Sequence, residues 1–231
     1  MRNAHAGKSF HSPCAPCLLT YRSNMCAKKS GRSSRSEKDA GAPLPYFKHP
    51  LAVVESDEVG EGTRVWAWTH VMKGAKVGRD CNIGEHCFLE NGCSIGDRVT
   101  VKNGVCIWEK VTVEDDVFLG PNMIFTNATD VRGGVRRPLI PTLVRKGASI
   151  GAGAIIICGH TLGRYCSVGA GAVMTKDVPD HALVYGNPAR QHGWVCHCGL
   201  KLDFSEEKAR CSCGREYLSD GAAIHPLVDK E

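Results

Sequence analysis

The chain has 231 residues, 42% of them hydrophobic, and a formal net charge of +5. That length and apolar content suffice to bury a core, and no stretch is long and apolar enough to span a bilayer. The charge is too mild to favour a nucleic-acid partner, so we expect neither nucleic-acid binding nor membrane insertion.

Residues 1–45 are expected to form a disordered leader, because they are rich in Ser, Lys and Arg and lack regular apolar spacing. They contain no apolar run of about 7 to 15 residues with a small-residue cleavage site, so a signal peptide is not expected. The other interpretation is translation begun upstream of the true start, with Met25 as the first residue. Cys14 and Cys17 have a metal or redox spacing, but we assign them no function in such a segment.

Residues 46–180 carry an aliphatic or aromatic side chain at every sixth position. Before the first interruption these anchors are Val59, Val65, Val71, Val77, Ile83, Leu89, Ile95, Val101, Ile107, Val113, Leu119 and Phe125. Neither an α-helix nor a flat strand repeats every six residues, whereas a short fixed repeat is the signature of a β-helix. Small or β-branched residues fill the fourth place after each anchor and also point inward. We predict an all-β fold, a parallel β-helix of about six coils with three hexads in each.

The repeat breaks immediately after Phe125-Thr126-Asn127. Residues 128–143 have no six-residue phase and contain two prolines, a Gly-Gly pair and three arginines. The repeat then resumes at Val144, one residue out of register. A segment that interrupts a solenoid without ending it is typical of an extruded loop on a binding face. We therefore predict an extruded loop over residues 128–143.

Residues eighteen positions apart are expected to stack on one wall. The outward column through Asn127 then contains Lys73, Asn91, Glu109, Asn127 and Cys158. Polar side chains in these places cannot belong to the core, and most such outward places are simply solvated. Asn127 differs because it lies where the loop leaves the wall, in a corner that rigid repeats hold in place.

Several cysteines occupy inward, small-residue places of the repeat. These are Cys81, Cys87, Cys93 and Cys166. We interpret them as packing residues whose thiols stay reduced, which favours a reducing, cytoplasmic location.

Residues 181–231 are predicted to form a small C-terminal extension. Within it, Cys196-His-Cys198-Gly and Cys211-Ser-Cys213-Gly repeat one pattern across a polar segment of ribbon-like length. Four thiolates can close a tetrahedral structural zinc site. The spacing within each pair is one residue rather than the usual two, so free thiols are the alternative interpretation.

The polar residues favour acyl transfer over metal or triad chemistry. His70, His86 and His160 occupy unrelated places of their hexads, and no Ser-His-Asp motif is present. Transfer to an amine requires positioning, an oxyanion donor and a route for one proton, and a neutral amide such as Asn127 can orient the amine. Small residues leave the wall of the last coils open to a long, thin cofactor: Gly147, Ala148, Gly151, Ala152, Gly153, Gly169, Ala170, Gly171 and Ala172.

Six stretches also carry a family resemblance. They are Ile95-Gly-Asp-Arg-Val-Thr-Val101, Val113-Glu-Asp-Asp-Val-Phe-Leu-Gly-Pro-Asn122, Phe125-Thr-Asn127, Lys146-Gly-Ala-Ser-Ile-Gly151, Val168-Gly-Ala-Gly-Ala-Val173 and Gly186-Asn-Pro-Ala-Arg190. With them, residues 49–195 resemble the left-handed β-helix acetyltransferases that use acetyl-CoA, and more closely the nucleotide-sugar N-acetyltransferases of bacterial polysaccharide pathways. The resemblance implies a left-handed β-helix and a homotrimer with acetyl-CoA in the cleft between neighbouring subunits.

Two branches of that family are similar to this chain. The closer-looking branch 3-N-acetylates UDP-2-acetamido-3-amino-2,3-dideoxyglucuronate, and it also continues past the helix with a Gly-Trp segment like Gly193-Trp194. The other acetylates dTDP-3-amino-3,6-dideoxyhexoses. The residue types at 102–104 and 108–109 are intermediate between the patterns of the two branches. The loop reads Asp130-Val-Arg132, where the family usually has Asn/Tyr-Pro-Arg. The sugar therefore stays open.

The resemblance places Asn127 at the 3-amino group, and Glu109 beneath it is expected to receive a proton or bind a sugar hydroxyl. The residues predicted to bind the substrate are Lys102, Asn103, Trp108, Arg132, Arg136 and Arg137, the arginines as clamps for a diphosphate or carboxylate. Those predicted to bind acetyl-CoA are Gly151, Ala152, Gly169, Ala170, Lys176 and Arg190. No general base is assigned, because the leaving thiolate can accept the proton.

The resulting prediction is a cytoplasmic acetyl-CoA-dependent N-acetyltransferase acting on a nucleotide-linked 3-amino sugar for surface polysaccharides such as lipopolysaccharide or O-antigen. One alternative is a non-catalytic β-helix scaffold or sugar-binding module, which has no need of a cofactor groove. The other is a sugar O-acyltransferase. Such enzymes usually rely on a histidine base, and no histidine shares the column of Asn127.

Overall fold

The structure is a computed structural model that describes residues 45–227. Residues 1–44, which make up all but the last residue of the predicted leader and include Cys14, Cys17 and Met25, lie outside the described residues. Within the described range the chain forms 25 short strands, and no helix there has the length and apolar character needed to cross a membrane.

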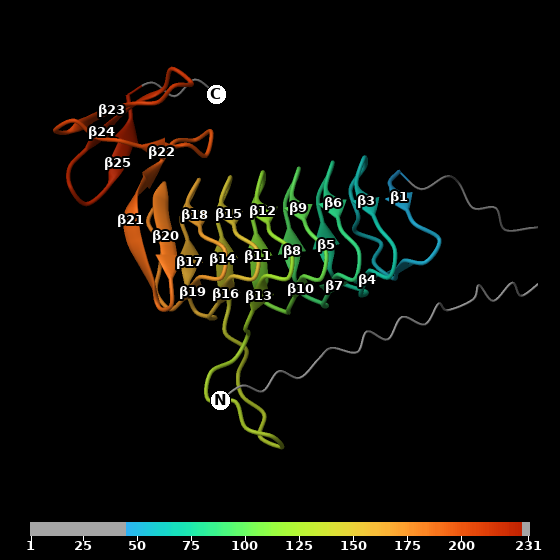
Figure 1. Ribbon diagram of the computed structural model, residues 1–231. Helices are drawn as coiled ribbons and strands as arrows, with labels where there is room; N and C mark the ends of the chain where they lie inside the picture. Colours follow the sequence, from blue (N-terminus) through green and yellow to red (C-terminus); the bar gives the residue numbers. More distant parts are fainter. Residues whose placement is uncertain (1–44, 228–231) are drawn as a thin grey trace, which may run out of the picture. The chain divides into compact units, whose positions relative to one another are not determined.

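Three parallel sheets form the walls of the β-helix (Figure 1). Sheet A contains β1 (Phe47–Lys48), β3 (Arg64–Val65), β6 (Asn82–Ile83), β9 (Thr100–Val101), β12 (Phe118–Leu119), β15 (Ser149–Ile150) and β18 (Ser167–Val168). Sheet B contains β2 (Val53–Val54), β4 (His70–Val71), β7 (Phe88–Leu89), β10 (Cys106–Ile107), β13 (Ile124–Phe125), β16 (Ile155–Ile156) and β19 (Val173–Met174). Sheet C contains β5 (Lys76–Val77), β8 (Ser94–Ile95), β11 (Val111–Val113), β14 (Thr142–Val144) and β17 (Thr161–Leu162). The predicted left-handed parallel β-helix is confirmed.

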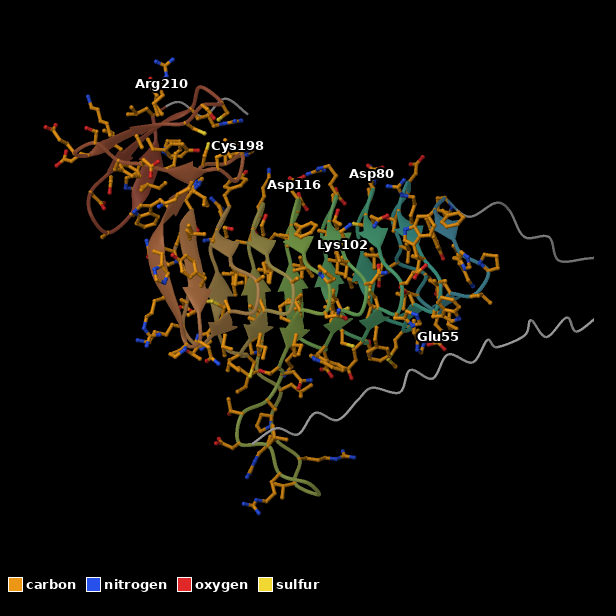
Figure 2. The ribbon with its side chains drawn as sticks, viewed as in Figure 1. Glu55, Asp80, Lys102, Asp116, Cys198 and Arg210 are labelled. Atoms are coloured by element: carbon orange, nitrogen blue, oxygen red, sulfur yellow. The ribbon has the colours of Figure 1, made fainter. Side chains whose placement is uncertain are left out.

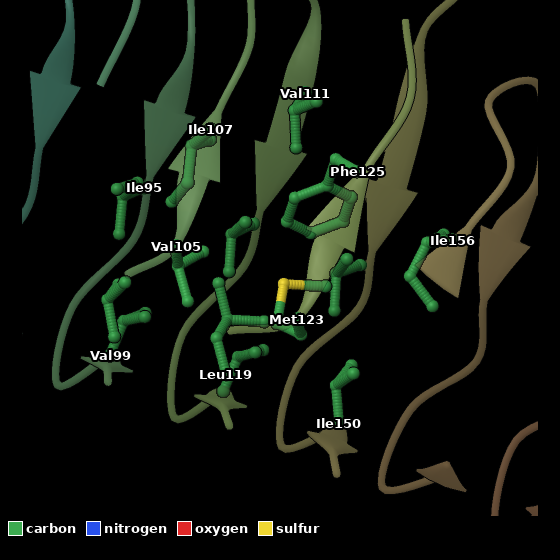
Figure 3. Packing of buried hydrophobic residues seen from close by; sticks show 14 of the residues in the cluster. Ile95, Val99, Val105, Ile107, Val111, Leu119, Met123, Phe125, Ile150 and Ile156 are labelled. Atoms are coloured by element: carbon green, nitrogen blue, oxygen red, sulfur yellow. The ribbon is translucent and has the colours of Figure 1, made fainter. Parts of the chain in front are cut away.

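The six-residue repeat produces this stacking directly. Ile83 pairs with Val65 in the coil before it and with Val101 in the coil after it. Because side chains alternate along a strand, the anchor points inward and the residue before it points outward. The anchors of all three sheets therefore meet in one buried cluster, part of which is drawn in Figure 3.

Each coil turns three corners, which we name by the sheets they join. The A/B corner lies between sheets A and B, as at residues 102–104; the B/C corner lies between sheets B and C, as at residues 108–110. The C/A corner lies between sheets C and A, as at residues 114–117. Since each coil repeats the same path, residues of one corner form a column along the β-helix.

The inward cysteines pack as predicted. Cys87, Cys93 and Cys166 are buried and free of disulfides. Burial raises the pKa of Cys87 to about 11 and the pKa of Cys93 and of Cys166 to about 12. A thiol with so high a pKa stays protonated at neutral pH, so these side chains act as small apolar groups.

The loop projects from the B/C corner between β13 and β14 (Figure 1). Its neck is closed where the Ile140 amide donates to the Asn127 carbonyl at 2.9 Å. The predicted end at residue 143 is two residues too late, because Thr142 and Leu143 already belong to β14 and pair with β11. The anchor period alone could not locate this return, since pairing resumes before the first anchor, Val144.

The C-terminal residues first extend sheet A. Strand β20 (Ala182–Gly186) pairs parallel with β18, β21 (Ala189–Val195) pairs antiparallel with β20, and β22 (Lys201–Leu202) pairs antiparallel with β21. Sheet A thus continues past residue 180. A separate antiparallel sheet follows, made of β23 (Lys208–Arg210), β24 (Glu216–Ser219) and β25 (Ile224–Pro226). Its small core is a second cluster around the buried Tyr217.

We expect Leu119→Ala to lower the free energy of unfolding by about 2–5 kcal/mol, because it leaves a cavity in a closely packed core. Leu119 is fully buried. The matched control is Leu51→Ala, since Leu51 is 53% exposed. Denaturant unfolding of the two variants beside the parent protein measures the difference. Equal losses of stability in both variants would contradict the packing described.

Candidate active site

Asn127 lies where β13 ends and the extruded loop begins. The Ile140 amide donates to the Asn127 carbonyl, and two further bonds hold the residues just before it: the Thr126 hydroxyl accepts from the Cys158 amide at 2.9 Å, and the Trp108 indole donates to the Phe125 carbonyl at 2.7 Å. Asn127 is half-buried, and within residues 45–227 its side-chain amide has no hydrogen-bond partner. A held backbone with a free amide is suited to position a ligand.

The column predicted through Asn127 is confirmed by the strand register. Cys106 pairs with Ile124, and Ile124 pairs with Ile155. At the B/C corner the order along the β-helix is therefore Lys73, Asn91, Glu109, Asn127, Cys158 and Lys176. Cys158 is buried, so the polar part of the column adjoining Asn127 lies on the side of Glu109.

Glu109 is half-buried in this column. Its backbone amide donates to a carboxylate oxygen of Glu90 at 2.8 Å, which fixes the turn that carries it. The Glu109 side chain leans toward the preceding coil, where its Cγ would lie 3.0 Å from a Cβ added at Gly92, and within the described residues its carboxylate makes no hydrogen bond. That arrangement can offer a hydrogen-bond acceptor to a hydroxyl or amine bound at Asn127.

Most of the predicted cofactor residues lie at the other edge of sheet B. Gly151 and Ala152 follow β15, and Gly169 and Ala170 follow β18, all at the A/B corner. Arg190, on β21, pairs with Tyr185 beside Gly169 and is exposed. Lys176 alone of this set lies at the B/C corner, where it is exposed.

Two of the predicted substrate residues, Lys102 and Asn103, also lie at the A/B corner. Lys102 is exposed. The side-chain oxygen of Asn103 accepts a hydrogen bond from the Glu85 amide at 3.2 Å, so Asn103 stabilises the turn of the preceding coil. Trp108 lies beside Asn127 at the B/C corner and is half-buried, with its indole committed to Phe125. Trp108 therefore supports the backbone of Asn127 rather than offering its N–H to a substrate.

The glycines of the open wall divide into two kinds. A Cβ added at Gly151 would clash with the backbone nitrogen of Ala170, so glycine is needed there for the two coils to approach each other. Gly169 is likewise crowded by Tyr185 at 2.7 Å. Gly153 and Gly171 have no atom within 4 Å of an added Cβ. With the exposed Ala152 and Ala170, these two make an open surface. The rest of the predicted open wall is wrong: Ala148 and Ala172 point into the core, and Gly147 packs against Tyr165 at the C/A corner.

The three loop arginines are exposed and lie away from the corner columns. Arg132 forms a bridge with Val135 inside the loop, and Arg137 donates to the Asp130 carbonyl at 3.4 Å. Arg136 is exposed as well. Within the described residues, none of them is paired with Asn127 or Glu109. The three guanidinium groups therefore lie on the exposed loop, outside the wall.

The predicted site residues of one chain thus fall into two groups, which we call half-sites, at opposite edges of sheet B. The B/C half-site contains Asn127, Glu109, Trp108 and Lys176, and the A/B half-site contains Lys102, Asn103, Ala152, Ala170 and Arg190. Sheet B separates the two groups, so a single chain does not bring the predicted catalytic residues together with the predicted cofactor residues other than Lys176.

Two features of the surface escaped the sequence analysis. Trp68 is 55% exposed and stacks on His86 at the A/B corner, with ring centroids 4.9 Å apart. The outward column of sheet B is almost wholly apolar: Val53, His70, Phe88, Cys106, Ile124, Ile155 and Val173. The signal was present from His70 onward, since each of those residues directly precedes an anchor in every third hexad; Val53 lies outside the six-residue phase and pairs with His70 seventeen positions later.

Comparison with known proteins agrees with this architecture. Residues 58–91 match the bacterial transferase hexapeptide (six repeats), and residues 144–176 match the hexapeptide repeat of succinyl-transferase. The dTDP-3-amino-3,6-dideoxy-alpha-D-galactopyranose 3-N-acetyltransferase of Aneurinibacillus thermoaerophilus is 51% identical over 183 residues, which are 79% of this chain and 95% of that protein. The chain belongs to the hexapeptide-repeat acetyltransferases.

Two further proteins are similar to part of the chain. The bifunctional protein GlmU of Thermosynechococcus vestitus is 32% identical over 133 residues, which are 58% of this chain and 28% of that protein. A point mutant of AntD, an N-acyltransferase from Bacillus cereus, superposes with a TM-score of 0.53 at 19% identity. That match covers 59% of this chain and 82% of that chain. As a member of this family, the chain is an acyltransferase.

We expect Asn127→Ala to lower kcat/KM about 100-fold or more, because positioning of the acceptor is lost while the hydrogen bonds of the backbone remain. Asn91→Ala is the matched control, since Asn91 lies in the same column two coils away. Steady-state kinetics and thermal unfolding of both variants check this. A near-normal rate in Asn127→Ala would remove this side chain from the mechanism.

Proposed function

We propose that the protein is an acetyl-CoA-dependent N-acetyltransferase that acetylates the 3-amino group of a nucleotide-linked amino sugar. The observation that carries the proposal is the free, half-buried amide of Asn127 at the root of the extruded loop. The 51% identity to the dTDP-3-amino-3,6-dideoxygalactose enzyme favours a dTDP-linked 3-amino-3,6-dideoxyhexose as substrate. A UDP-linked 3-amino-glucuronate is the second candidate, favoured by the Gly193-Trp194 segment on β21.

In the proposed reaction the neutral 3-amine attacks the thioester carbonyl of acetyl-CoA. The new bond is C–N, the C–S bond breaks, and the amine proton leaves with the CoA sulfur as a thiol. The Asn127 side-chain oxygen accepts a hydrogen bond from the amine and so directs its lone pair at the carbonyl carbon. Glu109 binds a neighbouring sugar hydroxyl. No side chain of the chain has to change its protonation state.

Acetyl-CoA is assigned to the A/B corner. The open surface of Ala152, Gly153, Ala170 and Gly171 leaves room for an elongated ligand against the wall. Lys102 and Arg190 are exposed at the same corner, where their charges can pair with the phosphates of the cofactor. The cofactor supplies an activated acetyl group, and the residues of the A/B corner hold the cofactor in place for the transfer of that group.

The half-sites meet if three copies assemble through sheet B, and we propose this homotrimer as the working enzyme. The apolar outward column of sheet B, with Ile124 50% exposed, is the surface that such an assembly would cover. Three sheets arranged around an axis form a triangle. At each vertex the A/B corner of one copy adjoins the B/C corner of the next. Asn127 of one subunit would then face acetyl-CoA held by its neighbour.

We also place the reaction in the cytoplasm, in the synthesis of sugars for surface polysaccharides such as lipopolysaccharide or O-antigen. Buried thiols kept protonated and free of disulfides support a reducing compartment.

Incubation of the protein with acetyl-CoA and a panel of dTDP- and UDP-linked amino sugars tests the activity. We expect mass spectrometry to detect an acetylated product fastest with a dTDP-linked 3-amino-3,6-dideoxyhexose. The matched 4-amino isomer should react much more slowly, because its amine would lie away from Asn127. The absence of an acetylated product with every 3-amino sugar would sink the proposal.

Co-expression of two defective variants tests the shared site. Asn127→Ala damages the B/C half-site, and Ala152→Glu places a repelling charge in the A/B half-site. Each variant alone is expected to be almost inactive. In random mixed trimers about a quarter of the sites combine two intact halves, so activity should return to about a quarter of the parent value.

The control for this experiment is a mixture of Asn127→Ala with Asn127→Asp, which share the damaged half and should not complement each other. Analytical ultracentrifugation of the parent protein measures the subunit number. Activity no greater than the sum of the separate variants, or a monomer in solution, would contradict the shared site.

A further inference from the structure

The four cysteines of the C-terminal residues converge in the fold. The sulfur atoms of Cys196, Cys198, Cys211 and Cys213 all lie within 4.8 Å of one another. Cys196 and Cys213 are 3.5 Å apart, as are Cys198 and Cys211. We propose that these four thiolates hold a structural Zn²⁺ ion.

The sulfur separations distinguish a metal site from a disulfide. Zn–S bonds of about 2.3 Å in a tetrahedron place the sulfur atoms about 3.8 Å apart, within the observed range of separations. A disulfide needs about 2.05 Å, and neither 3.5 Å pair approaches that length. All four cysteines are free.

Two nearly identical turns present the four sulfurs. In the first, the Gly199 amide donates to the Cys196 carbonyl at 2.8 Å, and in the second the Gly214 amide donates to the Cys211 carbonyl at 2.9 Å. Both glycines are left-handed, with φ of 87° and 90°, which explains the Cys-X-Cys-Gly pattern. In each turn the first cysteine is buried and the second exposed. The two turns therefore offer matched halves of one tetrahedron.

Tyr217 supports the first turn from the core of the extension. Its hydroxyl donates to the Cys196 sulfur at 3.2 Å and accepts from the His197 amide at 2.9 Å. A hydroxyl that donates to a ligand sulfur stabilises the thiolate and fixes its direction, as outer-shell groups do at metal sites.

The apolar core of the C-terminal extension is too small to stabilise it well without a cross-link. Apart from the cysteines, the buried members of its core are Leu202, Ala209, Tyr217 and Ile224. A core of this size rarely folds without a cross-link or a metal. A four-cysteine site supplies the cross-link, and its closed shell leaves no position for a substrate.

The zinc site lies away from both half-sites. The ring of His197, between two of the ligands, packs against Tyr165 at the C/A corner with centroids 4.1 Å apart. Cys198 and Asp116 line a common pocket there, and both are labelled in Figure 2. The two half-sites flank sheet B, whereas the C/A corner lies between the other two sheets. The ion is thus structural, and its presence does not depend on the proposed reaction.

Elemental analysis of the full-length protein, purified without chelator, tests the proposal. We expect about one zinc per chain. Replacement of the two exposed ligands, Cys198→Ser with Cys213→Ser, should lower the zinc content at least about fivefold and the thermal stability with it. Two controls should keep the full zinc content: Cys106→Ser, which alters a half-buried thiol of sheet B, and Cys14→Ser with Cys17→Ser in the leader.

Reconstitution with Co²⁺ gives a second measurement that does not depend on the variants folding. The parent protein should acquire the visible absorption of a tetrahedral tetrathiolate cobalt centre. Several results would overturn the site: no bound metal, iron in place of zinc, a Cys198–Cys211 disulfide, or zinc that remains when Cys198 and Cys213 are replaced. Acetyl-transfer activity enters neither measurement, so failure of the proposed function leaves this result unaffected.

Discussion

The hydrogen bonds between successive coils are the constraint on which this structure depends. Each strand pairs with the strand one coil away, as Ile83 pairs with Val65 and Val101. A slip of one residue would turn every anchor to solvent and every outward side chain into the core. The register is therefore fixed along the whole β-helix, and each corner becomes a column of superposed residues. Asn127 and Glu109 lie together for this reason, although eighteen positions separate them.

The same constraint explains how an irregular loop coexists with a rigid wall. The chain leaves the wall after Asn127, and although the six-residue count shifts by one across the loop, the strand pairing is kept, since Val144 pairs with Val113 and Ile156 pairs with Phe125. The neck bond from Ile140 to Asn127 closes the gap in the wall. Variation in the loop therefore alters what lies outside the wall without disturbing Asn127, and a solenoid with such a loop can serve related sugars through loop sequence.

The C-terminal residues follow a different physical rule. Along the β-helix each new coil buries its anchors against the one before it, so stability grows by repetition. Between β22 and residue 227 the chain adds no further coil, and the few apolar residues around Tyr217 form a core of their own. In a larger domain, more buried apolar surface would stabilise such a fold. Here we propose that the metal bound by the sulfurs of the two Cys-X-Cys-Gly turns does so.

The sequence by itself determined the β-helix, the inward cysteines, the column through Asn127 and the position at which the loop begins. Each follows from a local period, which any parallel stacking of coils must preserve. The tertiary structure alone decided that Lys102 and Ala152 lie across sheet B from Asn127, that Gly151 serves coil contact, and that sheet A continues past residue 180. Because every hexad has the same pattern, the six-residue period does not show to which of the three sheets a given hexad belongs. That is settled only when three hexads close a turn and each strand meets its partner in the next coil.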